Sequence, residues 1–180
     1  AAGSGRSCYV NVGQAPASIY AALRRGRYDA VPRDLSVFSG RKVRLGAYGD
    51  PAAAPLGIWL GVVGVAAGHT GYTHQWLTCD RGFAKLCMAS VDSRAEQFLA
   101  ESLGYRTFRV RAEDDRVRGR NEALCPASAE AGNKLTCESC MACGGTLRGQ
   151  RGGITISVHG SAGVRRAYGR NFKGVEVIAA

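Results

Sequence analysis

The sequence predicts an α/β fold in which mostly parallel strands alternate with helices, arranged as a barrel or a partial barrel. Segments typical of strands recur between segments with helical periodicity. One stretch, residues 85–110, has the order and the length of a βαβ unit. The length of 180 residues suits a single domain, 1–180, with a cysteine-rich insertion at 121–150.

The elements outside that unit follow from local signals. We expect a strand at 8–13, a helix at 16–27, a strand at 42–48, a helix at roughly 52–67, a short strand at 72–76 and a last strand at 154–158. Pro16 at the start of the first helix and Arg27 near its end are favourable there. Lys42 to Tyr48 alternates between polar and apolar residues, and Asp50-Pro51 is a typical helix start.

The βαβ unit has the clearest boundaries. Residues 85–91 form an apolar segment typical of a buried strand, and Asp92-Ser93 is expected to cap a helix that runs from Arg94 to Leu103. Gly104 ends that helix, and residues 105–110 form the next strand. Such a crossover is right-handed and joins parallel strands.

The charge balance indicates an anionic partner. The chain carries 24 Lys and Arg residues against 14 Asp and Glu, for a net charge of +10, and only four of the basic residues are Lys. The planar fork of Arg suits phosphates and guanine edges, so we expect a nucleic acid or nucleotide partner contacted by Arg106, Arg109 and Arg111. The alternative is an ordinary solvated surface encoded by a GC-rich genome.

The chain shows no sign of a membrane partner. Residues 51–79 contain no charged side chain, but their apolar part, 51–68, is shorter than the ~20 residues of a span and is interrupted by Pro55 and several glycines. Seven cysteines without a secretory leader predict a reducing cytoplasm, that of the host cell if a phage encodes the chain. The start, Ala1-Ala2-Gly3-Ser4-Gly5, indicates a chain that lacks an N-terminal segment.

Four cysteines predict a metal centre. Cys125, Cys137, Cys140 and Cys143 give the spacing C-x11-C-x2-C-x2-C in a glycine-bearing loop. Each x2 spacing lets two sulfurs face one metal, which fits either an iron–sulfur cluster or zinc. The alternative role, favoured if the metal is zinc, is to staple a loop that has no core of its own. Cys87 is expected in the core, and Cys8 is a candidate for a second site.

Asp50 and Asp92 are the candidate catalytic residues, because each follows a predicted strand. Catalytic groups collect at this edge of parallel sheets and barrels. One carboxylate as nucleophile and the other as general base would suit glycosyl or base-exchange chemistry. Both residues also fit the N-cap position of a helix, which is the alternative.

A substrate pocket is predicted around His74. His69 and His74 lie in an uncharged stretch, and Tyr72, His74, Gln75 and Trp76 could stack on a base and hydrogen-bond to it. The alternative is that one histidine is a hydrogen-bonded core residue.

Several sequence blocks together resemble a group of uncharacterised phage and prophage cysteine-cluster proteins, over most of the chain. The blocks are 5–14, 45–51, 73–76, 91–93 and 125–128 with the three later cysteines. The family pattern includes an upstream Cys-x-x-Cys segment that this chain lacks. More distantly, acids at strand ends combined with a cysteine cluster resemble radical SAM barrels and guanine-exchanging transglycosylases.

These observations predict a metalloenzyme that modifies a nucleic-acid base or a nucleotide by transferase-like or radical chemistry. Its cofactor would be an iron–sulfur cluster or zinc. The rival hypothesis is a non-catalytic, zinc-stabilised module that binds DNA or RNA through its arginines. A third possibility is a remnant that is active only together with its missing N-terminal part.

Overall fold

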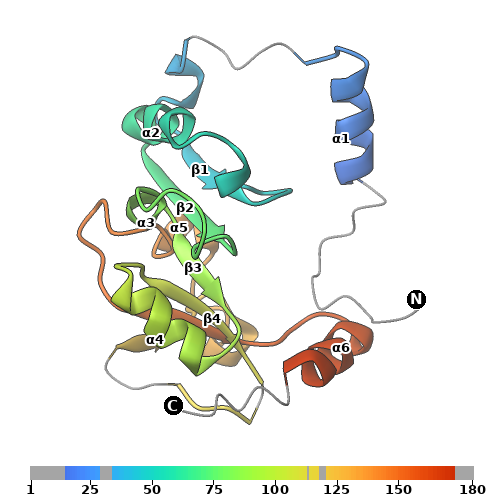
Figure 1. Cartoon of the computed structure of the whole chain (residues 1–180), viewed down its shortest axis with the longest axis vertical. Coiled ribbons are helices and arrows are strands. Elements are labelled where there is room, and N and C mark those ends of the chain that lie inside the picture. The colour runs from blue at the N-terminus through green and yellow to red at the C-terminus, as the bar shows by residue number, and fades with distance from the viewer. Residues whose placement is uncertain (1–14, 29–33, 113, 118–120, 173–180) are drawn as a thin grey trace.

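The computed structural model describes residues 15–28, 34–112, 114–117 and 121–172 (Figure 1). Its six strands are β1 (Lys42–Leu45), β2 (Gly68–Thr73), β3 (Met88–Val91), β4 (Thr107–Arg111), β5 (Glu122–Leu124) and β6 (Gly153–Ser157). They form one sheet in the order β1-β2-β3-β4-β6-β5, and every neighbouring pair is parallel. The predicted α/β class with parallel strands is confirmed.

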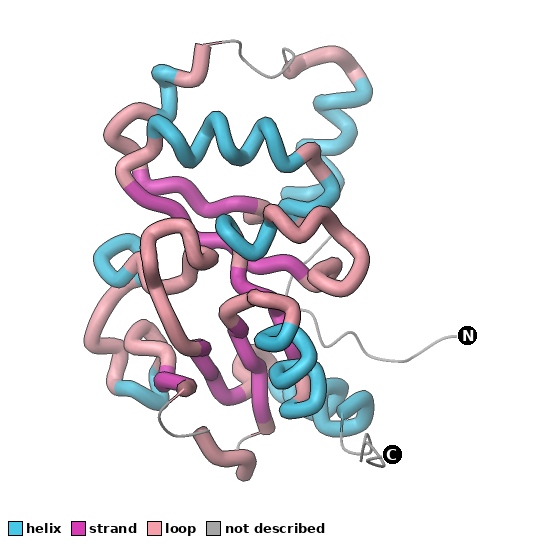
Figure 2. Tube along the Cα trace, turned by 60° about the vertical axis from the view of Figure 1, so that its left-hand side comes forward, coloured by secondary structure: helices cyan, strands magenta, loops and turns pink. Residues whose placement is uncertain are grey.

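Helices alternate with these strands along the chain. They are α1 (Ala15–Arg24), α2 (Leu56–Val65), α3 (Phe83–Leu86), α4 (Arg94–Ser102), α5 (Cys137–Cys140) and α6 (Ala162–Phe172), with 3-10 turns η1 (Ser36–Phe38), η2 (Pro51–Ala53) and η3 (Ala129–Ala131). The tube view shows the strands side by side, with α2 running alongside the β1 end of the sheet (Figure 2). Helix α1 buries no residue and stands apart from the sheet (Figure 1). No helix in the described ranges is long and apolar enough to cross a bilayer.

The βαβ unit is confirmed, with one correction at its start. Ser93 caps α4 by accepting a hydrogen bond from the Glu96 amide at 3.2 Å, and Gly104 leaves the helix with φ of +85°. The predicted strand at 85–91 is shorter, because residues 83–86 form the helical turn α3 and Cys87 closes that turn with its amide. Strand β3 therefore begins at Met88.

The β1–β2 connection also differs from the prediction. Strand β1 ends at Leu45, because Gly46 turns the chain with φ of +66° and lies close to Pro51. The helix expected at 52–67 is divided into η2 and α2, with Pro55 before the second. The strand expected at 72–76 starts earlier, at Gly68, and ends at Thr73. The strand predicted at 8–13 lies outside the described residues.

The two faces of the sheet have different covers. On one face Leu45, Ala89 and Val91 pack with Leu86 and Ala100 from the helices, which makes the larger core. On the other face, strand side chains pack against the cysteine-rich segment; the cluster contains Met88, Cys125, Cys143 and Ile154 with Tyr72, Phe108, Ala127, Ala142 and Ile156. The insertion is therefore part of the second core.

Candidate functional site

A cavity of about 640 Å³ lies at the carboxyl ends of the strands, on the face that the cysteine-rich segment covers. Parallel strands all end at this edge, so the residues that follow them converge. Asp50 follows the β1 end, His74 follows β2, Asp92 follows β3, Cys125 follows β5 and His159 follows β6, and all five line the cavity.

Asp92 is the carboxylate best placed for chemistry. Its side chain is half-buried in the cavity wall. The Tyr168 hydroxyl donates to the Asp92 backbone carbonyl at 3.3 Å, but none of the hydrogen bonds found among the described residues ends on its carboxylate oxygens. Burial raises its pKa, the charge of Glu96 adds to the rise, and His74 opposes it. The capping role expected for Asp92 falls to Ser93 instead. A carboxyl with a raised pKa and no fixed partner suits general acid–base catalysis.

Asp50 performs the capping role that was the alternative for it. Its carboxylate accepts hydrogen bonds from the Ala52 amide (2.9 Å), the Thr73 hydroxyl (2.8 Å) and the His74 amide (2.7 Å). It thereby ties η2 to the end of β2 and fixes the backbone of His74. Because three donors occupy this carboxylate, it has less capacity than Asp92 to act on a substrate, and its catalytic role stays a prediction.

The predicted binding residues separate into two groups. Tyr72 and His74 line the cavity, whereas Gln75 is exposed outside it. Trp76 is only 3% exposed and belongs to the core on the helix face, where its indole N–H donates to the Ser90 carbonyl at 3.1 Å. Both faces of the Trp76 ring are covered by core residues, so the ring has no open face on which a base could stack.

The cavity has an aromatic wall that includes Phe108, which was not predicted as a site residue. The rings of Tyr72 and Phe108 meet edge to face with centroids 4.7 Å apart. The Arg44 guanidinium lies 5.8 Å from the centroid of the Tyr72 ring. Alternation along β4 places Phe108 on the cavity face, a signal that becomes useful only once the strand direction is known.

His69 follows the core alternative. It is 3% exposed, and its Nε2 lies 3.0 Å from the Leu86 carbonyl. Burial lowers its pKa, which favours the neutral ring.

All four predicted metal-ligand cysteines line this same cavity. Cys125 and Cys143 are each 9% exposed, Cys140 is half-buried and Cys137 is exposed. The pKa of Cys143 is raised to about 11, chiefly by burial. The hydrogen bond between the Tyr72 hydroxyl and the Cys143 sulfur opposes this rise, and the charges of the other three thiols add to it. Burial also raises the pKa of Cys125, as do the charges of Cys137 and Cys140. The thiols are thus close enough to influence one another.

The thiols are nevertheless not gathered closely enough to bind one metal ion among the described residues. In the part of the chain that the structure describes, no three His, Cys, Asp or Glu side chains are grouped so that they could hold a metal ion. The six described cysteines are all free thiols, and Cys8 lies outside the described residues. The donor chemistry fits zinc or iron–sulfur, but binding would require the thiols to close in.

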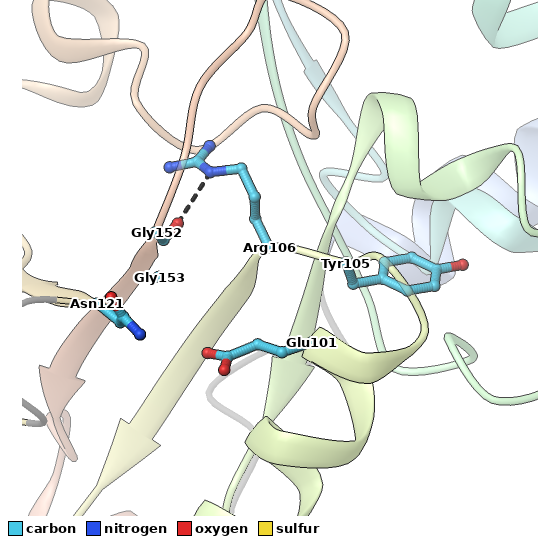
Figure 3. Close-up of a pocket in the computed structure, with 6 residues that line it drawn as sticks. All are labelled: Glu101, Tyr105, Arg106, Asn121, Gly152 and Gly153. Carbon is cyan, nitrogen blue, oxygen red and sulfur yellow. Dashed lines mark hydrogen bonds between the residues drawn. The ribbon is translucent and has the colours of Figure 1, made fainter.

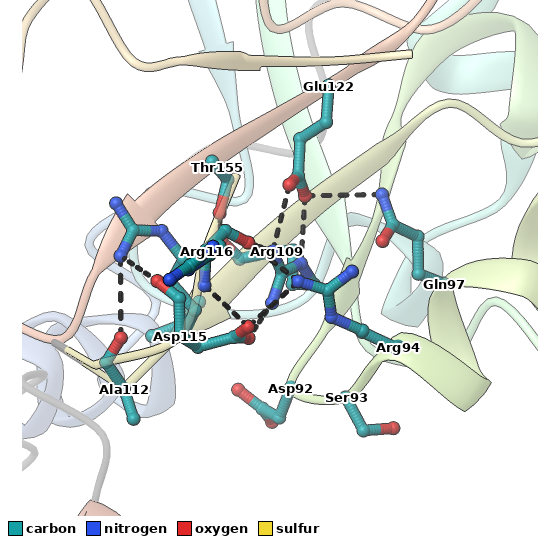
Figure 4. Close-up of polar contacts among 12 residues, drawn as sticks. Asp92, Ser93, Arg94, Gln97, Arg109, Ala112, Asp115, Arg116, Glu122 and Thr155 are labelled. Atoms are coloured by element: carbon teal, nitrogen blue, oxygen red, sulfur yellow. Dashed lines mark hydrogen bonds and ion pairs between the residues drawn. The ribbon is translucent and has the colours of Figure 1, made fainter. Parts of the chain in front are cut away.

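Arg109 and Arg111, expected to meet phosphate, are buried in ion pairs. Arg109 is fully buried and forms two hydrogen bonds of 2.8 Å with Glu122, and it also pairs with Asp115 (Figure 4). Arg111 is 3% exposed and pairs with Glu130. With their donors turned inward, neither offers a free guanidinium to a phosphate. Arg106, which was expected to act with them, is also buried, and its guanidinium donates to backbone carbonyls.

Comparisons with models of protein families, with curated proteins and with solved structures give no match for this chain.

Proposed function

We propose that this chain is an enzyme that modifies a nucleobase or nucleotide bound in the cavity, and that its cysteines hold an iron–sulfur cluster or zinc. The observation that carries the proposal is that one cavity contains Asp92, His74 and all four cysteines of the cluster. A single purpose would explain why residues spread from position 74 to position 143 are brought to one edge of the sheet.

The dimensions and lining of the cavity favour a planar, partly anionic ligand. Its volume of about 640 Å³ is within the ~300–1,000 Å³ usual for small-molecule sites. Tyr72 and Phe108 offer aromatic surface for stacking, and Arg44 brings a positive charge beside it. The net charge of +10 on the chain would also attract a ligand that carries phosphate groups. We also propose that the strands form a partial barrel around this space.

Each residue of the cavity wall would have a separate role in the proposed reaction. Asp92, with its raised pKa, would exchange a proton with the bound base, and the positive form of His74 would favour the charged carboxylate. Asp50 would hold His74 in place through the backbone. Cys125, Cys137, Cys140 and Cys143 would hold the metal, which supplies Lewis-acid or electron-transfer chemistry when bound. A reducing, cytoplasmic setting would keep these thiols available.

The first test is the metal. The chain is purified anaerobically, and its iron, sulfide and zinc contents are measured with its visible absorption spectrum. We expect stoichiometric metal that is lost from a Cys137→Ser variant and kept by Cys79→Ser. Cys79 is a suitable control because it is a free thiol that does not line the cavity. Metal content that is unchanged in Cys137→Ser would contradict the assignment.

The second test addresses catalysis and ligand. Binding of the four ribonucleoside 5′-monophosphates is measured by calorimetry, and turnover of the tightest-binding one is followed by mass spectrometry. Asp92→Asn should reduce turnover by ~10²–10⁴-fold while binding is kept. The matched control Asp34→Asn alters a carboxylate that caps a turn outside the cavity and should have no effect.

A non-catalytic nucleic-acid-binding module is the second candidate, and the net charge of +10 favours it. Such a module would bind DNA or RNA with an affinity that falls steeply as salt rises. Asp92→Asn would leave that binding unchanged. If the chain binds oligonucleotides in a salt-dependent manner and turns over no nucleotide, the enzyme proposal is refuted and the binding-module proposal takes its place.

A further inference from the structure

Arg106 holds the backbone on both sides of Cys143. It stands just before β4, at the end of the sheet opposite Asp92, and is 7% exposed. Its Nη1 donates to the Ala142 carbonyl at 2.8 Å and to the Gly144 carbonyl at 2.7 Å. Its Nε donates to the Gly152 carbonyl at 2.9 Å (Figure 3). One side chain therefore joins both neighbours of a predicted ligand to the start of β6.

The segment that Arg106 grips is fitted into the sheet. The Cys143 carbonyl accepts a hydrogen bond from the Gly71 amide at 3.0 Å, and the Thr146 amide donates to the Ala84 carbonyl at 3.0 Å. Between them, a Cβ at Gly145 would lie 2.3 Å from the Lys85 carbonyl carbon, so the two backbones are in direct contact. The segment thus passes between β2 and α3, and Arg106 fixes it from the β4 side.

The guanidinium also places a positive charge near Cys143. Burial lowers the pKa of the Arg106 guanidinium, and the charge of a Cys143 thiolate opposes that fall. None of the ion pairs found among the described residues involves Arg106. A buried cation is costly without an anion. Thiolates that bind a metal carry negative charge and would provide that anion at this place.

We propose that Arg106 is the positioning residue of the cysteine cluster: it clamps the carbonyls that flank Cys143 and sets a buried positive charge beside that predicted ligand. This inference rests on the proposed metal centre, but its structural part holds for the metal-free chain as well. Arg148 is the matched control, because it also donates to two backbone carbonyls, those of Ala66 and Ala67, and touches neither neighbour of Cys143.

The first measurement is amide hydrogen exchange in the full metal-free chain. Arg106→Met should speed exchange in the peptide that covers residues 141–147 by at least about tenfold, since the clamp is lost and the adjoining cavity of about 180 Å³ admits water. Arg148→Met should leave that peptide unchanged. Equal exchange in Arg106→Met and wild type would overturn the clamp.

The second measurement separates this role from general support of the fold. Co²⁺ is titrated into each chain, and the thiolate-to-metal absorption reports both affinity and the number of bound thiolates. We expect an affinity ~10–100-fold lower and a weaker thiolate band in Arg106→Met, partial recovery in Arg106→Lys, and wild-type behaviour in Arg148→Met. A wild-type titration in folded Arg106→Met would refute the proposal.

The variants also keep the two proposals distinct. If Arg106→Met does not fold, Arg106→Lys carries the test, because it keeps the charge and loses the fork; a wild-type exchange rate at 141–147 would then overturn the clamp. If the wild-type chain binds no Co²⁺, Zn²⁺ or iron, the metal centre itself is refuted. In that case the exchange measurement still decides whether Arg106 fixes the Cys143 backbone.

Discussion

Replacement of Arg109 by Met should cost more stability than any single change at the surface. Arg109 is fully buried, and Glu122 shares two hydrogen bonds of 2.8 Å with it. Removing one partner of such a pair leaves a buried charge and costs ~3–5 kcal/mol. For a chain of this length each kcal/mol lowers Tm by roughly 2–4 °C, so Arg109→Met should melt roughly 6–20 °C below wild type.

The assay is thermal melting at pH 7 with urea unfolding of the same variants. Arg94→Met is the control, because Arg94 bonds to Asp115 at 2.9 Å with 44% of its side chain exposed. A surface pair of that kind contributes only ~0–1 kcal/mol. The double change Arg109→Met, Glu122→Leu should recover much of the loss, since it removes both buried charges. An Arg109→Met penalty no larger than that of Arg94→Met would refute the reasoning.

Two further predictions concern Asp92 and the glycines. Burial raises the pKa of Asp92, so the charged carboxylate destabilises the fold as the pH rises through that pKa. Asp92→Asn should therefore melt above wild type at pH 7, and the difference should shrink as the pH falls and vanish below ~4, where the carboxyl is protonated in the folded and the unfolded chain alike. A lower Tm at pH 7 would contradict this. Gly145→Ala should lose ~1–3 kcal/mol in urea unfolding, because its Cβ would lie 2.3 Å from the Lys85 backbone. Gly64→Ala, in α2 with nothing within 4 Å, should instead gain ~0.5–1 kcal/mol; equal effects at the two glycines would contradict the packing argument.

Local signals predicted the parts of the fold that local interactions determine. Ser93 and Gly104 mark the two ends of α4 in the sequence and mark them in the structure. The strand-end position of Asp92 also follows from that local pattern. Strand β5 escaped prediction because it has three residues, too few for a periodicity to appear.

The fate of the arginines and of Trp76 depends on contacts that are distant in sequence. Arg109 is buried because Glu122 reaches it from β5, and nothing near Arg109 in the sequence distinguishes it from a surface residue. Trp76 was predicted to face a ligand, but the sheet turns it toward the helix-side core. Spacing indicated a shared site for the cysteines, and the structure brings them to one cavity without gathering them around a metal.

The position of β6 sets the order in which the chain can assemble during synthesis. This strand pairs with both β4 and β5, yet it leaves the ribosome after both. Until residue 157 has emerged, β4 and β5 each keep an open edge facing a space that only β6 fills. Such edges are prone to pair with other chains, and pairing of strands far apart in sequence is slow. Closure of the described sheet therefore waits for β6, and nascent chains stalled before this strand would be the species most in need of a chaperone.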